Sequence, residues 1–203
     1  LSEGDAIILN DPYQGGMHLP DIFMFMPVFF AGELLAFTVV ICHHTDVGGR
    51  VPGSNASDST EIFQEGIRIP ALKLFEGGEP NSTLMRLVAT NVRLPDRVIG
   101  DLKAQYAACR TGAIELGQLA SRYGAEELAG HFSELLDYAE RMTREEIASW
   151  PDVPYRFQYF IDDDGFSAKP LPIRVPITVP GSWFPFSYAG SSPQVGAARN
   201  PHR

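Results

Sequence analysis

Two apolar segments separated by three residues constrain the fold of this chain most strongly. Ile22–Phe30 and Leu34–His44 are nearly continuous runs of aliphatic and aromatic side chains, and Ala31-Gly32-Glu33 lies between them. Short apolar runs joined by a three-residue loop that contains glycine are typical of a β-hairpin. Because neither run alternates regularly with polar residues, we expect this hairpin to be buried on both faces.

The middle of the chain predicts helices. A long helix is expected from Pro95, a favourable residue for a first turn, to Tyr123, and a second one over Glu126–Trp150. Both carry apolar residues at intervals of three and four, which indicates one buried face on each helix. We interpret the pair as a helical hairpin that contributes to the core.

The order of these elements favours an α+β fold over a doubly wound sheet, because strands and helices do not alternate regularly. We expect a buried antiparallel sheet with the helical hairpin packed beside it. The chain then divides into a strand-rich region over residues 1–80, the helical hairpin over residues 81–150 and a strand-rich tail over residues 151–203.

Charge and cysteine content exclude several classes of protein. The net charge is −9, from 16 basic and 25 acidic residues, which argues against binding to nucleic acid or to an anionic membrane. No apolar run is long enough to span a bilayer. Cys42 and Cys109 show no CxxC spacing, which suits buried thiols in a reducing cytoplasm, although a single disulfide between them stays open.

Three of the five histidines lie beside carboxylates at the edges of the apolar runs. His18 and Asp21 are three residues apart in a turn that Pro20 stiffens, immediately before the first run. His43 ends the second run, so antiparallel pairing returns it to the edge that Asp21 occupies. Imidazole and carboxylate groups that converge in this way can hold a divalent metal ion.

Strand alternation limits which side chains can join that site. His43 and His44 point to opposite faces, so at most one of them completes the site unless the strand bends. Asp46 is available as a further ligand or as a hydrogen-bond acceptor for an imidazole. The alternative is structural: His18 and Asp21 form a pair that fixes the turn, and the adjacent histidines are core groups. The donor set suits Mn, Zn and Fe alike.

A polar cluster follows the Gly- and Ser-rich segment over residues 45–60 and contains Glu61 and Glu65. One of these carboxylates can serve as a general base, and a solvated turn explains them nearly as well.

Four segments resemble successive motifs of the hydantoinase B/oxoprolinase family, in the family's order. They read "GDAIILNDPYQGGMHLPDI", "CHHTDVGGRVPGS", "TEIFQEGIRIPALKLFEGGE" and "NVRLPDRVIGDLKAQYAACRTGA". The match runs from Gly4 to about Tyr123, with a fainter continuation toward the end. Members of the family are longer than 203 residues, so residues 1–203 are expected to be part of a hydantoinase B/oxoprolinase domain and a fragment of a longer chain.

The resemblance implies an enzyme. The family includes ATP-dependent hydrolases that open cyclic amides such as N-methylhydantoin and 5-oxoproline, acting on a C–N bond of a small molecule. An A-type partner subunit or domain uses the ATP, so activity is expected only within an oligomeric complex. In metal-bearing relatives the ligands fall on the HxxD motif and the first His of the HH pair, which correspond here to His18, Asp21 and His43.

Two other functions are compatible with the same resemblance. Acetone and acetophenone carboxylases contain similar subunits, so the metal site can instead serve a ketone carboxylation that consumes ATP. A third reading assigns the fragment no catalysis and only an interface for the A-type partner. Metal binding by this chain would argue against the third reading.

Overall fold

The computed structural model describes residues 1–54 and 56–197. The chain forms two compact units, which are described separately below. The first comprises Leu1–Ala56 and Glu61–Ala129, and the second comprises Ser57–Thr60 and Gly130–Arg203.

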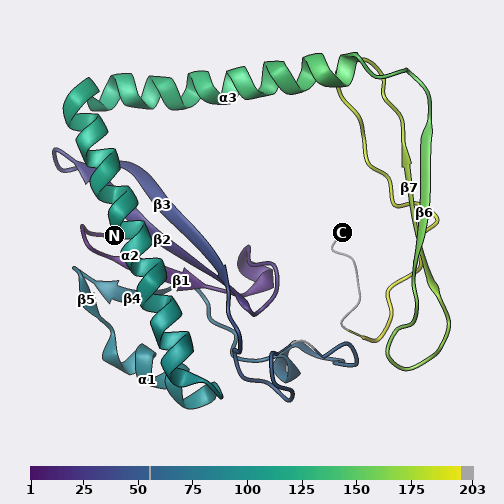
Figure 1. Cartoon of the computed structure of the whole chain (residues 1–203), viewed down its shortest axis with the longest axis horizontal. Helices are drawn as coiled ribbons and strands as arrows, with labels where there is room; N and C mark the ends of the chain where they lie inside the picture. Colours follow the sequence, from purple (N-terminus) through teal and green to yellow (C-terminus); the bar gives the residue numbers. More distant parts are fainter. Residues whose placement is uncertain (55, 198–203) are drawn as a thin grey trace. The chain divides into compact units, whose positions relative to one another are not determined.

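The first unit is built on a five-stranded antiparallel sheet with the order β3-β2-β1-β4-β5 (Figure 1). Its strands are β1 (Ala6–Leu9), β2 (Asp21–Phe30), β3 (Glu33–His43), β4 (Leu72–Glu76) and β5 (Glu79–Pro80). Two short 3-10 helices, η1 (Pro12–Gln14) and η2 (Ile62–Gln64), lie in its loops. All pairings are antiparallel and the helices follow as a block, so the predicted α+β class is confirmed.

The predicted hairpin is present as β2 and β3, which pair antiparallel from Asp21 opposite His43 to Phe30 opposite Glu33. Its turn is shorter than we expected. Glu33 already belongs to β3, and only Ala31 and Gly32 connect the strands. Both turn residues have positive φ angles, 52° and 86°. This is the backbone of a tight primed turn, whose twist matches that of the flanking strands.

Three helices follow the sheet in the sequence: α1 (Ser82–Asn91), α2 (Pro95–Tyr123) and α3 (Ala125–Ala148). The helix α2 has the predicted bounds, begins with proline and ends before Gly124. It lies across β2 and β3 and packs its apolar face on them (Figure 1). The core between helix and sheet contains fully buried Met24, Val98 and Leu102.

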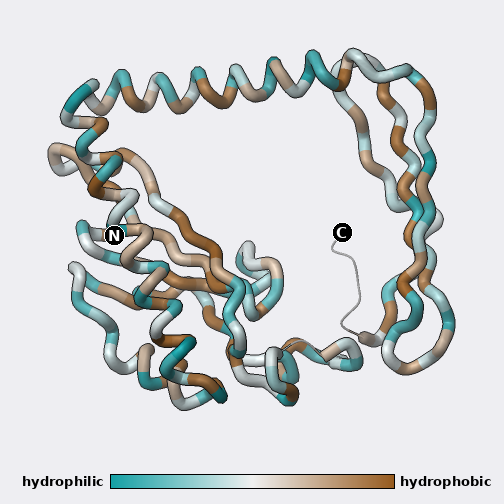
Figure 2. The backbone as a smooth tube through the Cα atoms, in the orientation of Figure 1, coloured by the Kyte–Doolittle hydropathy of each residue, from teal (hydrophilic) through white to brown (hydrophobic). Residues whose placement is uncertain are grey.

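Only one face of the hairpin is buried, so the expectation of burial on both faces is wrong. In β2, residues that point toward α2 are buried and the residues between them are half-buried. In β3 the other face carries Phe37, Val39 and Ile41, which are 45–54% exposed. Figure 2 shows the hydrophobic character of both strands. The continuous apolar runs predicted strands correctly, but α2 is the layer that covers them, and it lies on one side.

The expected helical hairpin core is also wrong in part. The stripe of α2 packs on the sheet, whereas α3 leaves Phe132, Leu135, Leu136 and Met142 between 37% and 72% exposed. The second unit adds a two-stranded sheet of β6 (Tyr155–Ile161) and β7 (Leu171–Ile177). Its buried apolar side chains among the described residues are Ile147, Leu171, Val179 and Ala197. That set is small for a packed core.

No helix among the described residues has the length and apolar character needed to cross a lipid bilayer.

The carboxylate of Asp5 ties the start of β1 to the neighbouring strand β4 and to the turn that follows it. It accepts hydrogen bonds from the backbone N–H groups of Ser2 and Gly77, at 2.8 and 3.1 Å, and lies 2.9 Å from Lys73 Nζ. Asp5 is 2% exposed. These bonds lower the pKa of Asp5 from 3.8 to about 2, and the bond with Lys73 has the largest effect.

Because the pKa of Asp5 is lower in the folded than in the unfolded chain, its carboxylate stabilises the fold above pH 3.8, and this stabilisation is lost as the pH falls through about 2. We expect Asp5→Asn to lower the free energy of unfolding by about 2 kcal/mol at pH 7, the range for hydrogen bonds to a charged group. The loss should shrink toward pH 2. Urea unfolding of both proteins across this range measures it, and a loss independent of pH would contradict the assignment.

Candidate metal centre

Buried residues and hydrogen bonds hold in place the turn that carries His18 and Asp21. Leu19 and Pro20, between them, are fully buried. The side chain of Asn10 donates to the Leu19 carbonyl at 2.8 Å and accepts from the Ile69 N–H at 2.6 Å. A backbone bond from Asp21 N to the His18 carbonyl, 3.0 Å long, closes the turn. The backbone that carries His18 and Asp21 is therefore held in place, and both side chains are half-buried near the start of β2.

The antiparallel register brings His43 to the same place. Asp21 and His43 are the last paired residues at this end of β2 and β3. Beyond them, His44 N donates to the Pro20 carbonyl at 2.7 Å. The His18 and His43 rings lie 5.0 Å apart between centroids, and His18 Nε2 is 3.0 Å from Asp21 Oδ2. One ligand atom from each of the three side chains lies within 4.8 Å of the others.

These three residues fit a divalent cation. In a tetrahedral site with metal–ligand distances of about 2.0–2.2 Å, ligand atoms lie about 3.3–3.6 Å apart. The three side chains would therefore need to move closer together to bind one ion. Two imidazole nitrogens and one carboxylate oxygen form a donor set that Zn, Mn and Fe accept, and three protein ligands leave positions open for water and substrate.

The surface beside the three side chains is apolar. Asp21 and Phe23 share one face of β2, and His43 and Ile41 share the same face of β3, because alternate residues of a strand point the same way. Ile41 is 54% exposed. This is the face that α2 does not cover. A ligand held at the three polar side chains would therefore rest its apolar part on Phe23 and Ile41.

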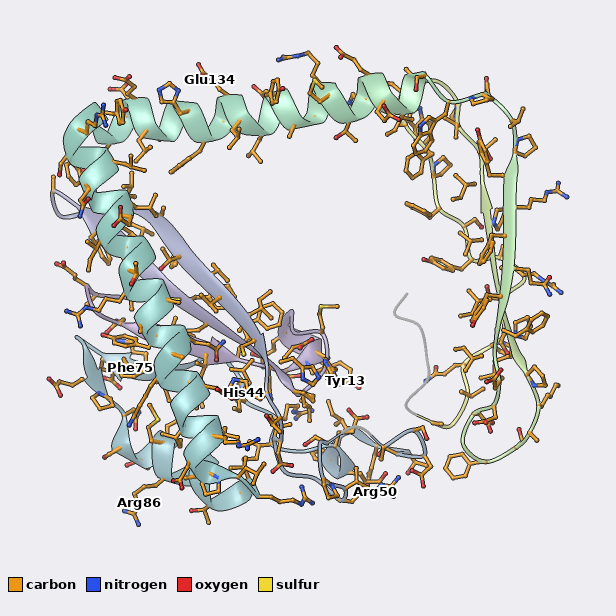
Figure 3. The ribbon with its side chains drawn as sticks, viewed as in Figure 1. Tyr13, His44, Arg50, Phe75, Arg86 and Glu134 are labelled. Carbon is orange, nitrogen blue, oxygen red and sulfur yellow. The ribbon has the colours of Figure 1, made fainter. Side chains whose placement is uncertain are left out.

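His44 lies outside the three-residue cluster. It is fully buried toward α2, on the opposite face from His43, as strand alternation predicts (Figure 3). Its Nε2 lies 2.9 Å from Gln105 Oε1, and its Nδ1 has no hydrogen-bond partner among the described residues. Burial lowers the pKa of His44, and the hydrogen bond to Gln105 opposes this. From the sequence alone His44 is open as a further ligand, but the structure places it in the core beside Gln105, away from the three-residue cluster.

Asp46 is bound by another residue rather than directed to the cluster. Its Oδ2 accepts from the Arg93 N–H at 2.6 Å, and its Oδ1 lies 2.8 Å from the Arg93 guanidinium. Asp46 is 2% exposed. One oxygen pairs with the partly exposed Arg93 guanidinium and the other accepts the Arg93 backbone N–H, so Asp46 anchors the loop after β3 to the segment that precedes α2.

The two acidic candidates after the loop differ in their surroundings. Glu65 is half-buried and close enough to His18 to interact with it electrostatically. Burial raises the pKa of Glu65, and His18 partly offsets this rise. Glu61 is exposed and precedes η2 without capping it. Glu65 is therefore the better placed of the two.

Sequence reasoning missed two buried amides around this end of the sheet, Asn10 and Gln105. Gln105 donates to the Ile22 carbonyl at 2.8 Å in addition to its contact with His44. The available signal was its position. Gln105 stands three residues after Leu102 and four before Cys109, on the apolar stripe of the long helix. A polar residue on such a stripe needs a buried partner.

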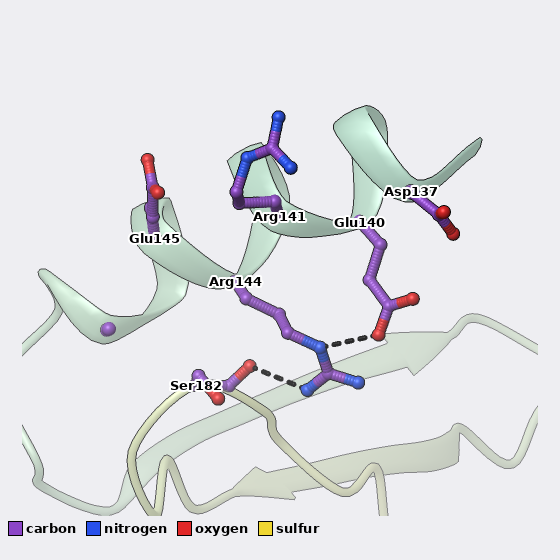
Figure 4. Close-up of a pocket in the computed structure, with 7 residues that line it drawn as sticks. Asp137, Glu140, Arg141, Arg144, Glu145 and Ser182 are labelled. Carbon is purple, nitrogen blue, oxygen red and sulfur yellow. Dashed lines mark hydrogen bonds and ion pairs between the residues drawn. The ribbon is translucent and has the colours of Figure 1, made fainter. Parts of the chain in front are cut away.

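A second concave surface lies on α3 in the other unit (Figure 4). Two of its charged groups pair: Arg144 donates to Glu140 at 2.7 Å, and it also donates to the Ser182 carbonyl at 3.5 Å. It is lined by Asp137, Glu140, Arg141, Arg144, Glu145, Ala148 and Ser182. Exposed ion pairs of this kind are typical of a solvated helix surface, so we assign it no chemistry.

Known proteins match the whole of this chain. A profile of the hydantoinase B/oxoprolinase family matches residues 1–203. The beta subunit of caprolactamase from Pseudomonas jessenii is 37% identical over 205 residues, which cover 95% of this chain and 35% of that protein. The delta subunit of acetophenone carboxylase from Aromatoleum aromaticum is 33% identical over 166 residues, or 81% of this chain and 24% of that protein.

A solved structure has the same fold. The crystal structure of ATP-dependent caprolactamase from Pseudomonas jessenii superposes with a TM-score of 0.89 at 36% identity, over 97% of this chain and 34% of that one. This chain therefore spans about a third of the length of the caprolactamase subunit that it matches.

We expect His18→Ala, Asp21→Ala and His43→Ala each to reduce the bound metal from about one ion per chain to a small fraction, because two ligands hold an ion far more weakly than three. Elemental analysis after dialysis against Zn²⁺ or Mn²⁺ measures this. His131→Ala is the matched control, since His131 is an exposed histidine on α3 that pairs with Glu134. Unchanged metal content in all three ligand variants would mean that the cluster binds no metal and only stabilises the turn.

Proposed function

The chain belongs to the hydantoinase B/oxoprolinase family, and on this premise we propose that it is the metal-bearing part of a subunit of an ATP-dependent enzyme that hydrolyses cyclic amides. Lactams, hydantoins and 5-oxoproline are the substrate class. The observation that carries the proposal is the convergence of His18, Asp21 and His43 beside an open apolar face. The caprolactamase of Pseudomonas jessenii, which shares the fold at 36% identity, supports the reaction type.

A cyclic amide resists hydrolysis because nitrogen donates electrons to its carbonyl. In the proposed reaction, an A-type partner subunit transfers the γ-phosphoryl group of ATP to the amide oxygen. The carbonyl carbon then becomes electrophilic and accepts water. The C–N bond breaks, nitrogen takes a proton, and an acyl phosphate remains. A second water hydrolyses this acyl phosphate, which releases phosphate and the carboxylate of the ring-opened product, while ADP leaves the partner subunit. His18, Asp21 and His43 would hold a divalent ion, which when bound would lower the pKa of a water molecule toward neutrality.

The residues of this chain have distinct tasks in that reaction. His18, Asp21 and His43 hold the ion at the end of the sheet. Glu65 accepts a proton from the attacking water, because burial raises the pKa of its carboxyl and brings its basicity closer to neutral conditions. Phe23 and Ile41 contact the methylene groups of the substrate ring, on the face that they share with the ligands.

We place the protein in the cytoplasm, in an oligomeric complex with the A-type subunit. Cys42 and Cys109 are free thiols in the structure, and a reducing compartment keeps them so. The relatives support the assembly, since two of them are named as a beta and a delta subunit.

The second candidate function is ketone carboxylation. It is favoured by the acetophenone carboxylase delta subunit, which is 33% identical over 81% of this chain. In this alternative, His18, Asp21 and His43 would hold an ion that serves a ketone carboxylation, in which a C–C bond to a carbon derived from bicarbonate forms and no C–N bond breaks. A non-catalytic interface role is the outcome if the full-length protein binds no metal.

The intact complex separates the two reactions. Incubation with ATP and a panel of lactams and hydantoins should release amino acids from lactams and N-carbamoyl amino acids from hydantoins, in step with ADP. ATP with acetophenone or acetone and ¹⁴C-bicarbonate should fix no label. Label fixed into acid-stable product without amide hydrolysis would replace the first proposal with the second.

We expect Glu65→Gln to lower kcat by about 10²–10⁴-fold, the usual contribution of a general base. Its metal content should equal that of the wild type. Glu61→Gln is the comparison, since it removes a nearby but exposed carboxylate and should lose much less. Steady-state kinetics with elemental analysis of each variant tests this. Equal losses in both variants would mean that neither carboxylate has the specific role.

A further inference from the structure

Gln105 is a buried amide at the centre of α2. It is 3% exposed and lies between fully buried Leu102 and nearly buried Cys109 on the helix face that packs against β2 and β3. A side-chain amide in such a place costs stability unless its donor and acceptor both find partners. The partners of Gln105 are therefore informative.

Those partners lie at the metal end of two different strands. Gln105 Nε2 donates to the carbonyl of Ile22 at 2.8 Å, and Oε1 lies 2.9 Å from His44 Nε2. Because an amide oxygen only accepts, the proton must reside on His44 Nε2. Ile22 directly follows Asp21, and His44 directly follows His43. Gln105 thus holds the residue next to one proposed ligand in each strand.

The end of a strand pair is where such a link has most effect. Asp21 and His43 form the terminal pair of the ladder, and the bond from His44 N to the Pro20 carbonyl is the backbone contact just beyond it. Terminal pairs separate more easily than central ones, because they have neighbours on one side. Separation of this pair would move the carboxylate of Asp21 away from the imidazole of His43.

We propose that Gln105 is a positioning residue that fixes the spacing of Asp21 and His43 and thereby sets the metal affinity of the site. This inference rests on the proposed metal function. Among the described residues, Gln105 has no hydrogen bond with a ligand side chain, so it would act through its short contacts with Ile22 and His44. A longer bond of 3.5 Å from Nε2 to the Val40 carbonyl adds a second link to β3. Residues that orient metal ligands from behind change metal affinity by about 10- to 100-fold when they are replaced.

The alternative is that Gln105 only satisfies buried polar groups. Its loss would then lower stability and leave metal affinity unchanged. Cys109→Ala provides the matched control. Cys109 is one turn further along α2 and faces the same two strands, with Sγ 3.8 Å from the carbonyls of Met24 and Thr38. Those contacts lie in the middle of the hairpin, away from the ligands.

The experiment measures dissociation constants for Zn²⁺ and Mn²⁺ on the full-length protein by competition with a chromogenic chelator, with the melting temperature of each metal-free variant. Gln105→Leu should weaken binding about 10- to 100-fold. Cys109→Ala should stay within about threefold of the wild type, since distant sites act independently. Gln105→Met keeps the unbranched shape of the side chain and should weaken metal binding as much as Gln105→Leu does. It serves as the test variant if Gln105→Leu does not fold.

A double-mutant cycle adds a second test. His44→Leu removes the other half of the link, so the combined variant with Gln105→Leu should bind metal no more weakly than the worse single variant. Equal affinities for Gln105→Leu, Gln105→Met and Cys109→Ala, or additive losses in the cycle, would overturn the proposal. A wild-type protein that binds neither ion would instead refute the metal function, and this inference with it.

Discussion

The pairing register of β2 and β3 is the constraint on which the rest of the structure depends. With Asp21 opposite His43, the inward residues of both strands face α2 and the outward residues carry two of the three candidate ligands. A slip by one residue would exchange the two faces. A slip of β2 would expose Met24, whereas a slip of β3 would turn His43 toward α2 and bring His44 to the outer face. The packing of the core and the convergence of the candidate ligands therefore require the same register.

The inner face of the hairpin contributes to stability, and the outer face carries the candidate site. The inner face, with α2, forms the core of the first unit. The outer face combines polar groups at its end with exposed apolar side chains along its length, such as Val39 and Ile41. Apolar surface of this kind beside convergent polar groups is typical of a ligand-binding wall. The arrangement suits a substrate with a polar amide and an apolar ring.

Much of this could be predicted from local patterns. The three-and-four spacing and the flanking Pro95 and Gly124 predicted α2 correctly, because helix ends depend on nearby residues. The apolar runs predicted the hairpin, and simple antiparallel geometry placed Asp21 beside His43. The combination His18, Asp21 and His43 needed only a turn and a hairpin, which are both short-range structures.

The features that the sequence did not reveal depend on distant contacts. An apolar run does not say how many layers cover it, so the exposed face of β3 could not be anticipated from Phe37 or Ile41. The occupation of Asp46 by Arg93 joins residues that are far apart in the chain. The same holds for Gln105, whose partners Ile22 and His44 precede it by 83 and 61 positions.

The distance along the chain between Gln105 and its partners has a consequence for how the site matures. The hairpin closes a short loop and forms on the time scale of microseconds, whereas docking of α2 must bring distant segments together and comes later. An ion captured by the nascent hairpin would be held loosely and exchange freely with others. If Gln105 positions the ligands as proposed, secure retention of an ion would begin only when α2 docks on the hairpin.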